Sequence, residues 1–282
     1  CVLKTTFASV HATIGNFNNH IGVPLTLLAT RTEPDIAIIE MGANAQEEIA
    51  LLAKIAEPNA AIITNIGRAH LEGFGGEDGV MKGKGELFDY LRNAQPEAPV
   101  FVHGSHPKLL ALSEGLNRTL YGTPSAAPFV SEVASVESFT WTGPSGALHG
   151  PLHVHVQGAH NRENIMSAIA IGLHFGVSEA ACTTAVEAYQ PDNNRSQWTS
   201  TASNRILLDA YNANPSSMCA ALTAFKRMAE ETADEGAPLC ILGDMAELGE
   251  HTEAAHEEVL ALAHELNMEI WAVGPCFHQV AT

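Results

Sequence analysis

Short apolar runs alternate with amphipathic segments along most of this sequence, and this alternation restricts the chain to an α/β fold. Helical periodicity is present over 45–56, 159–175, 178–189, 215–231 and 252–266. Apolar runs typical of buried strands occupy 36–41, 60–66, 205–209, 239–242 and 269–273. Because the strands of a parallel sheet are covered on both faces, such continuous runs predict a mostly parallel sheet.

Two departures from this alternation indicate how the chain is divided. Residues 119–158 hold several short β-like segments, and GPSG at 143–146 is typical of a hairpin turn, so we expect a small antiparallel sheet there. The polar segment QPDNNRSQW at 190–198 follows an expected helix and precedes a new strand. The sequence therefore predicts two domains, at 1–192 and 193–282.

Composition excludes several classes of function. The net charge of −18 argues against a sequence-independent nucleic-acid binder, because that affinity comes from Lys and Arg. No apolar run approaches the roughly 18 residues of a membrane-spanning helix. The five cysteines are widely spaced without a metal-binding pattern, which is typical of reduced thiols in a cytoplasmic protein.

Three segments near the start of the chain place polar groups directly after apolar runs. They are IAIIEMGAN (36–44), AAIITNIGRAHLEGFG (60–75) and GVMKGKGELF (79–88). In open α/β sheets, ligands bind beyond the carboxyl ends of the strands. We therefore expect the polar groups of all three segments to lie at strand ends and to meet at one ligand site.

The groups at this expected site suit a metal ion and phosphate. Glu40 supplies an anionic oxygen, Asn65 a neutral oxygen and His70 an imidazole, while Lys82 and Lys84 are paired cations. This set favours Mg²⁺ bridging the phosphates of a nucleotide over a zinc site. Taken singly, the same residues would be a solvated carboxylate, a turn residue and surface charges, so the prediction depends on their convergence.

The first residues do not form a phosphate-binding P-loop. Leu3 stands where the P-loop pattern has the glycine before its lysine, here Lys4, and if such a loop exists we expect it before residue 1. The chain also starts at Cys1 without Met and ends shortly after an expected strand. We interpret it as an internal piece of a longer protein, and we expect the piece alone not to turn over.

Seven motifs follow one another in a fixed order across nearly the whole chain. They are GNFNNHIGVP (15–24), EMGAN (40–44), TNIGRAHLEGFG (64–75), KGKGELF (82–88), GAHNRENIMSA (158–168), DAYNANPSSM (209–218) and LGDMAELGEHTEAAH (242–256). Together they closely resemble the ATP-dependent Mur ligases, and in particular the members that add D-alanyl-D-alanine to a UDP-N-acetylmuramoyl-tripeptide.

The resemblance implies an ATPase-type central domain, a Rossmann-like C-terminal domain, and a cytoplasmic monomer acting on these two small molecules. In the family, ATP phosphorylates a substrate carboxylate, and an amine then attacks the acyl phosphate. By resemblance, Glu40 and His70 are ligands of Mg²⁺, of which two ions are expected. Lys84 is the implied carbamylated lysine, because it stands four residues before an aromatic, Phe88.

The resemblance also implies which residues contact the nucleotide. His160, Asn161 and Asn164 open an expected helix and would meet the adenine, although ordinary helix capping is the alternative. Arg195 stands at the position of the interdomain arginine expected at the γ-phosphate. Asp209 ends an expected strand and would contact the ribose.

Two asparagine-rich loops are implied to face the other substrates. The loop after Asp209 is expected to be substrate-facing through Tyr211, Asn212 and Asn214, and the first motif is expected to face the UDP-sugar through Asn16, Asn18 and Asn19. These asparagines could equally be turn formers. Another Mur ligase, a folylpolyglutamate synthase-like ligase and a non-catalytic nucleotide-binding remnant stay open as alternatives.

Overall fold

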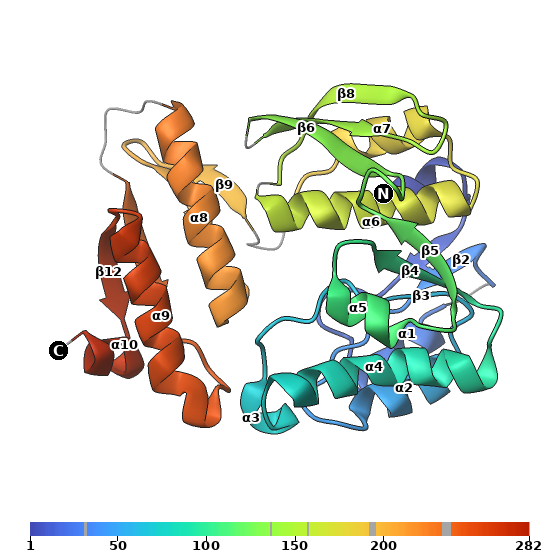
Figure 1. The fold of residues 1–282 in the computed structure, drawn as a ribbon, viewed down its shortest axis with the longest axis horizontal. Coiled ribbons are helices and arrows are strands. Elements are labelled where there is room, and N and C mark those ends of the chain that lie inside the picture. Colours follow the sequence, from blue (N-terminus) through green and yellow to red (C-terminus); the bar gives the residue numbers. More distant parts are fainter. Residues whose placement is uncertain (31–32, 136, 157, 192–195, 233–237, 282) are drawn as a thin grey trace.

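The structure is a computed structural model that describes residues 1–30, 33–135, 137–156, 158–191, 196–232 and 238–281. Two parts of the chain lie side by side, which we call the central part (1–191) and the C-terminal part (196–281) (Figure 1). Both combine strands with helices and contain parallel strand pairs, so the predicted α/β fold is confirmed.

The central part opens with the short 3-10 helix η1 (Val2–Thr5) and continues with parallel strands. β1 (Val10–Ala12) pairs with β2 (Ile36–Ile38), and β3 (Ala61–Ile62), β4 (Pro99–His103) and β5 (Asn117–Tyr121) form a second parallel sheet. The helices between them are α1 (Gly22–Leu28), α2 (Glu48–Ala56), α3 (Leu71–Phe74), α4 (Glu77–Ala94) and α5 (Pro107–Leu112). Buried Phe88 of α4 packs in one core with Val100 and Val102 of β4, which fixes α4 against the sheet.

An antiparallel sheet and two helices complete the central part. The sheet consists of β6 (Phe129–Ser135), β7 (Ser138–Thr142) and β8 (Leu148–His153), and the helices are α6 (Ala159–His174) and α7 (Glu179–Glu187). The N–H of Gly143 donates to the carbonyl of Ala147, which closes the turn between β7 and β8. The predicted antiparallel hairpin is therefore confirmed.

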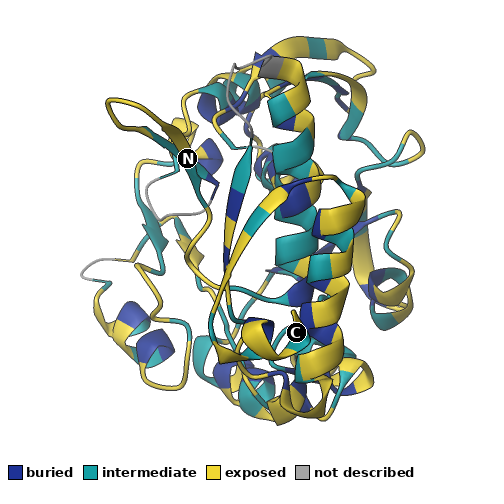
Figure 2. Cartoon of the chain, turned by 90° about the vertical axis from the view of Figure 1, so that its left-hand side faces the viewer, coloured by how far each residue is buried: buried dark blue, intermediate teal, exposed yellow. Residues whose placement is uncertain are grey.

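The C-terminal part has two strand pairs. β9 (Gln197–Ser200) and β10 (Arg205–Leu208) are antiparallel, whereas β11 (Leu239–Gly243) and β12 (Glu269–Val273) are parallel. The helices are α8 (Pro215–Thr232), η2 (Gly249–His251), α9 (Thr252–Glu265) and α10 (Pro275–Val280). Ala255, Val259 and Ala263 recur every four residues of α9 and are fully buried, so one face of this helix packs inward. Buried and exposed residues alternate along the long helices in the same way (Figure 2).

One hydrophobic core extends across both parts. Leu71 and Phe74 of α3 are buried in the same cluster as Leu242, Met245 and Leu248 of the C-terminal part. Helix α3 therefore belongs to the core of the C-terminal part, although its sequence neighbours belong to the central part. The loop that precedes α3 is held at the junction between the two.

Two expectations about the central strands are wrong. The strand expected over 60–66 is limited to Ala61–Ile62, and the segment 79–88, expected at a strand end, lies inside α4. Its glycines permit close packing and are not turn residues, because a Cβ on Gly83 would lie 2.3 Å from the ring of Phe74. Lys84 consequently projects from a helix.

The predicted domain boundary between residues 192 and 193 falls within 192–195, outside the described residues, and stays a prediction. In the described part of the chain, no helix is both long enough and apolar enough to cross a membrane.

Candidate functional site

Glu40 lies in the loop that follows β2, with its side chain exposed. Its backbone N–H donates to Thr13 Oγ1 at 2.9 Å, which ties the loop to the end of β1. The side-chain amide of Asn18 donates to Glu40 Oε1, also at 2.9 Å. Two predicted site residues from different motifs therefore meet, and Asn18 holds the carboxylate in one orientation.

Lys84 and Asn65 form a second pair of predicted site residues. The ammonium of Lys84 donates to the backbone carbonyl of Asn65 at 2.9 Å and lies 3.4 Å from its side-chain oxygen. Burial lowers the pKa of Lys84 from its ordinary value. Lys82 is exposed on the same helix, so Lys84 is the lysine that faces the loop after β3.

His70 lies directly before α3 and contacts the C-terminal part. Its Nδ1 is hydrogen-bonded to Oε2 of Glu247, in the loop that follows β11. His70 and Glu247 both have positive φ angles, 55° and 60°, a conformation that costs an L-residue about 1–2 kcal/mol. A pocket of about 140 Å³ adjoins the pair, and its lining includes Asn212 and Asn214. The fold thus brings together three predicted site residues, His70, Asn212 and Asn214, and Glu247, which was not predicted.

Further contacts fix α3 and the loop before it to the C-terminal part. The guanidinium of Arg68 donates to Glu258 of α9 at 2.6 Å, and the backbone N–H of Arg68 donates to Ser216 Oγ at 3.2 Å. The N–H of Glu72 donates to the backbone carbonyl of Glu247 at 3.3 Å. Contacts with α8, α9 and the loop after β11 therefore converge on one segment of the central part.

The residues predicted to contact the nucleotide lie at the start of α6 and the end of β10. The amide of Asn161 lies 3.5 Å from Ser196 Oγ, and the N–H of Ser196 donates to Asp209 Oδ1 at 3.1 Å. Their predicted places in the secondary structure are confirmed, since HNRENIM opens α6 and Asp209 directly follows β10, and the nucleotide contacts themselves stay predictions. Ser196, directly before β9, thus links the start of α6 to the end of β10.

His160 is the predicted nucleotide contact whose environment is most unusual. Within the described residues its Nδ1 is buried without a hydrogen-bond partner. Burial lowers the pKa of His160, although the negative charge of Asp209 acts in the opposite direction. Asn164 is exposed one turn further along α6, and Arg195 lies outside the described residues.

The remaining predicted residues include clear turn formers. Asn19 Oδ1 accepts the N–H groups of Ile21 and Gly22 at the start of α1, and Asn214 Oδ1 accepts that of Ser217 at the start of α8. Exposed side chains are found at Asn16, Tyr211 and Asn212. The substrate-facing roles of these residues stay predictions.

No hydrogen bond or ion pair between described residues joins Glu40, His70 and Lys84 to one another. Their partners are Asn18, Glu247 and Asn65. The segments that carry Glu40 and His70 are nevertheless neighbours, because the side chain of Gln46, six residues after Glu40, donates to the carbonyl of Phe74, four residues after His70, at 3.3 Å. Lys84 joins them through its bond to Asn65, five residues before His70. The arrangement has a carboxylate, an imidazole and an amine on adjacent segments.

Comparison with known proteins identifies the family. The model of the Mur ligase middle domain matches residues 2–172, and that of the Mur ligase glutamate ligase domain matches residues 194–276. This chain belongs to the Mur ligase family.

Several Mur ligases of established name are similar to it. The UDP-N-acetylmuramoyl-tripeptide–D-alanyl-D-alanine ligase of Bacillus subtilis is 36% identical over 91% of this chain and 54% of that protein. The ligase of the same name from Escherichia coli is 35% identical over 96% of this chain and 60% of that protein. The chain thus spans little more than half the length of these relatives.

Solved structures support the same family. MurF from Acinetobacter baumannii superposes with a TM-score of 0.86 and 30% identity, covering 99% of this chain and 60% of that one. The MurF ligase of Thermotoga maritima, in complex with ADP, shares the fold, with a TM-score of 0.85 and 23% identity over 99% of this chain and 64% of that one.

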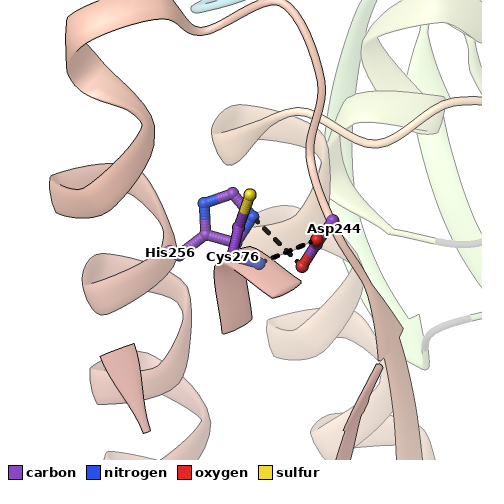
Figure 3. A group of neighbouring side chains, drawn as sticks. All are labelled: Asp244, His256 and Cys276. Carbon is purple, nitrogen blue, oxygen red and sulfur yellow. Dashed lines mark hydrogen bonds and ion pairs between the residues drawn. The ribbon is translucent and has the colours of Figure 1, made fainter. Parts of the chain in front are cut away.

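One cluster in this Mur ligase chain was not predicted from sequence. Asp244, His256 and Cys276 meet where β11, α9 and α10 come together (Figure 3). Asp244 accepts the N–H groups of Cys276 and Phe277, each at 2.9 Å, and His256 Nε2 accepts the N–H of Met245 at 3.0 Å. The residues could bind a metal by type, but these hydrogen bonds already occupy both carboxylate oxygens of Asp244 and Nε2 of His256.

The cluster fixes the loop that carries Glu247. His256 Nδ1 donates to the carbonyl of Thr252 at 2.7 Å, so both ring nitrogens have partners. Asp244 and Met245, which these bonds hold, are the first residues of that loop. The motif LGDMAELG continues from the end of a strand, as EMGAN and DAYNANPSSM follow strands, and this position was the signal that could have identified Glu247 from the sequence.

We expect Asp244→Asn to lower the free energy of unfolding by about 1–3 kcal/mol, because an amide nitrogen cannot accept the second backbone N–H. Urea unfolding measures this, with Glu269→Gln on the exposed start of β12 as the control. Burial raises the pKa of Asp244, but the hydrogen bonds outweigh it and leave the pKa below the ordinary 3.8. The difference in free energy of unfolding between Asp244→Asn and the parent should therefore be full above pH 3.8. It should disappear as the pH falls through the lowered pKa of Asp244. An equal effect in both variants at neutral pH would contradict this role.

Proposed function

We propose that the protein containing this chain is an ATP-dependent amide ligase that adds D-alanyl-D-alanine to a UDP-N-acetylmuramoyl-tripeptide. The observation that carries the proposal is the meeting of motif residues from both parts, since His70 of the central part and Asn212 and Asn214 of the C-terminal part line one pocket. Relatives named for this reaction match 90% or more of the chain. The proposal includes cytoplasmic peptidoglycan precursor synthesis by a monomer.

The central part is proposed to activate the substrate carboxylate. Glu40 and His70 would hold Mg²⁺, and Lys84 would contribute after carbamylation, in which its neutral amine adds CO₂ and loses a proton. The residues fit these roles because Glu40 is exposed and oriented by Asn18, and because burial lowers the pKa of Lys84 and so favours the neutral amine. When bound, the metal would neutralise the charge between carboxylate and γ-phosphate.

The nucleotide is proposed to lie between α6 and β10. His160 and Asn161 would contact the adenine, with Asn164 beside them, and Asp209 would accept hydrogen bonds from the ribose hydroxyls. The buried Nδ1 of His160, which has no hydrogen-bond partner among the residues that the structure describes, supports a polar partner at this position. Arg195 is proposed to contact the γ-phosphate.

The two asparagine-rich loops are proposed to bind the other substrates. Asn16, Asn18 and Asn19 would face the UDP-sugar, and Tyr211, Asn212 and Asn214 would hold the incoming dipeptide so that its amine reaches the acyl phosphate. Binding of each substrate by a different part would restrict amide formation to the state in which the parts are docked.

Product analysis tests the proposal directly. The intact protein that contains this sequence is incubated with ATP, Mg²⁺, the UDP-tripeptide and D-alanyl-D-alanine, and mass spectrometry measures the UDP-pentapeptide. We expect product and one phosphate per ligation, with neither formed when any component is omitted. Ligation of glutamate to a folate, or of a single amino acid to the UDP-precursor, would favour the alternative ligases. Nucleotide binding without any ligation would favour a non-catalytic role.

A further inference from the structure

The contact between His70 and Glu247 joins residues that lie 177 positions apart and belong to different parts of the chain. The two side chains are 28% and 55% exposed, so their pairing contributes little to stability. Both residues are nevertheless held in the left-handed backbone region. A weak surface pair does not account for two strained residues, and strain of this kind concentrates at functional sites.

The surrounding structure holds Glu247 in this position from both sides. The backbone carbonyl of Glu247 accepts the N–H of Glu72 in α3. On the other side, His256 accepts the N–H of Met245, and Asp244 accepts the N–H of Cys276 at the start of α10 (Figure 3). Asp244 and Met245 begin the loop that carries Glu247. The carboxylate is therefore presented to His70 by a fixed scaffold.

The chemistry of the pair determines which imidazole nitrogen remains available. The carboxylate oxygen is the acceptor in this geometry, which assigns the donor role to Nδ1 of His70. Nε2 then keeps its lone pair for a metal ion. In metalloproteins a ligating histidine typically donates its other ring N–H to a carboxylate or carbonyl, which fixes the tautomer and the ring orientation.

We propose that Glu247 is a positioning residue that orients His70 so that Nε2 faces the metal of the nucleotide site. Because Glu247 comes from the C-terminal part, the metal site is complete only when that part is docked on the central part. This inference rests on the proposed function, in which His70 is a metal ligand.

The experiment measures the affinity for Mn²⁺ in the intact protein saturated with a non-hydrolysable ATP analogue, from the EPR signal of the free ion. Glu247→Gly removes the carboxylate and also relieves the positive φ angle. We expect the Mn²⁺ affinity to fall about 10-fold to 100-fold while the thermal midpoint stays the same or rises. Glu247→Gln keeps a hydrogen-bond acceptor and should retain most of the affinity.

A matched control separates the effect of losing the carboxylate from the effect of relieving the positive φ angle. Glu57 ends α2 with a φ angle of 47° and an exposed side chain, so Glu57→Gly makes the same change in the same conformation away from the site. It should leave the Mn²⁺ affinity unchanged. Nitrogen NMR of His70 should show the Nδ1-protonated tautomer in the parent protein and lose this preference in Glu247→Gly.

The outcomes distinguish this inference from the proposed function. In a His70→Ala background, Glu247→Gly should cause no further loss of affinity; an additional loss would show that Glu247 binds the metal itself and would overturn the positioning role. Unchanged affinity in Glu247→Gly, with weakened binding in His70→Ala, would also overturn it. If His70→Ala binds Mn²⁺ as the parent does, the metal assignment within the proposed function fails instead.

Discussion

Glu40→Gln should lower the ligation rate by at least about 10²–10³-fold, the loss that follows when a positioned electrostatic group is removed from a transition state. The fold should persist, because the side chain is exposed and glutamine can still accept the amide of Asn18. Steady-state kinetics of the intact protein measures the loss, and circular dichroism checks the fold. Glu57→Gln, at the exposed end of α2, is the control and should have normal activity. Near-normal turnover in Glu40→Gln would remove Glu40 from the site.

Lys84→Ala should abolish ligation almost completely, and short carboxylic acids such as formate or acetate should restore part of it by replacing the carbamate. Lys84→Arg should remain inactive, because a fixed cation cannot be carbamylated. Kinetics with and without added acid measures the rescue. Lys82→Ala is the matched control, since Lys82 is exposed two residues away on the same helix, and it should keep most of the activity. Full activity in Lys84→Arg would show that the side chain acts as a cation.

Periodicity predicted the long helices well because their buried faces repeat at fixed spacing. Helices α6, α8 and α9 begin and end within one residue of the predicted limits. Helix α4 was missed because its glycines resemble turn signals in sequence, whereas in the structure Gly83 permits the ring of Phe74 to pack against the helix. The reason for that glycine lies in a neighbour that no local pattern reveals.

The candidate site was predictable in part, because local sequence patterns show where strands end. Glu40, Asn65 and Asp209 follow strands, and strand ends can be recognised from apolar runs. Glu247 and Arg68 were not assigned, because their partners His70 and Glu258 lie 177 and 190 residues away in sequence. Contacts of this kind arise only when the two parts dock.

The central claim is that ATP activates a carboxylate of the UDP-substrate before the amine attacks, and oxygen labelling tests it most directly. The terminal carboxylate of the UDP-tripeptide is enriched in ¹⁸O, the intact protein completes ligation with ATP and D-alanyl-D-alanine, and mass spectrometry of the released phosphate is recorded. An acyl phosphate requires one labelled oxygen to pass from the carboxylate to each phosphate, and we expect that transfer in step with amide formation. Unlabelled phosphate accompanying labelled product would contradict the account.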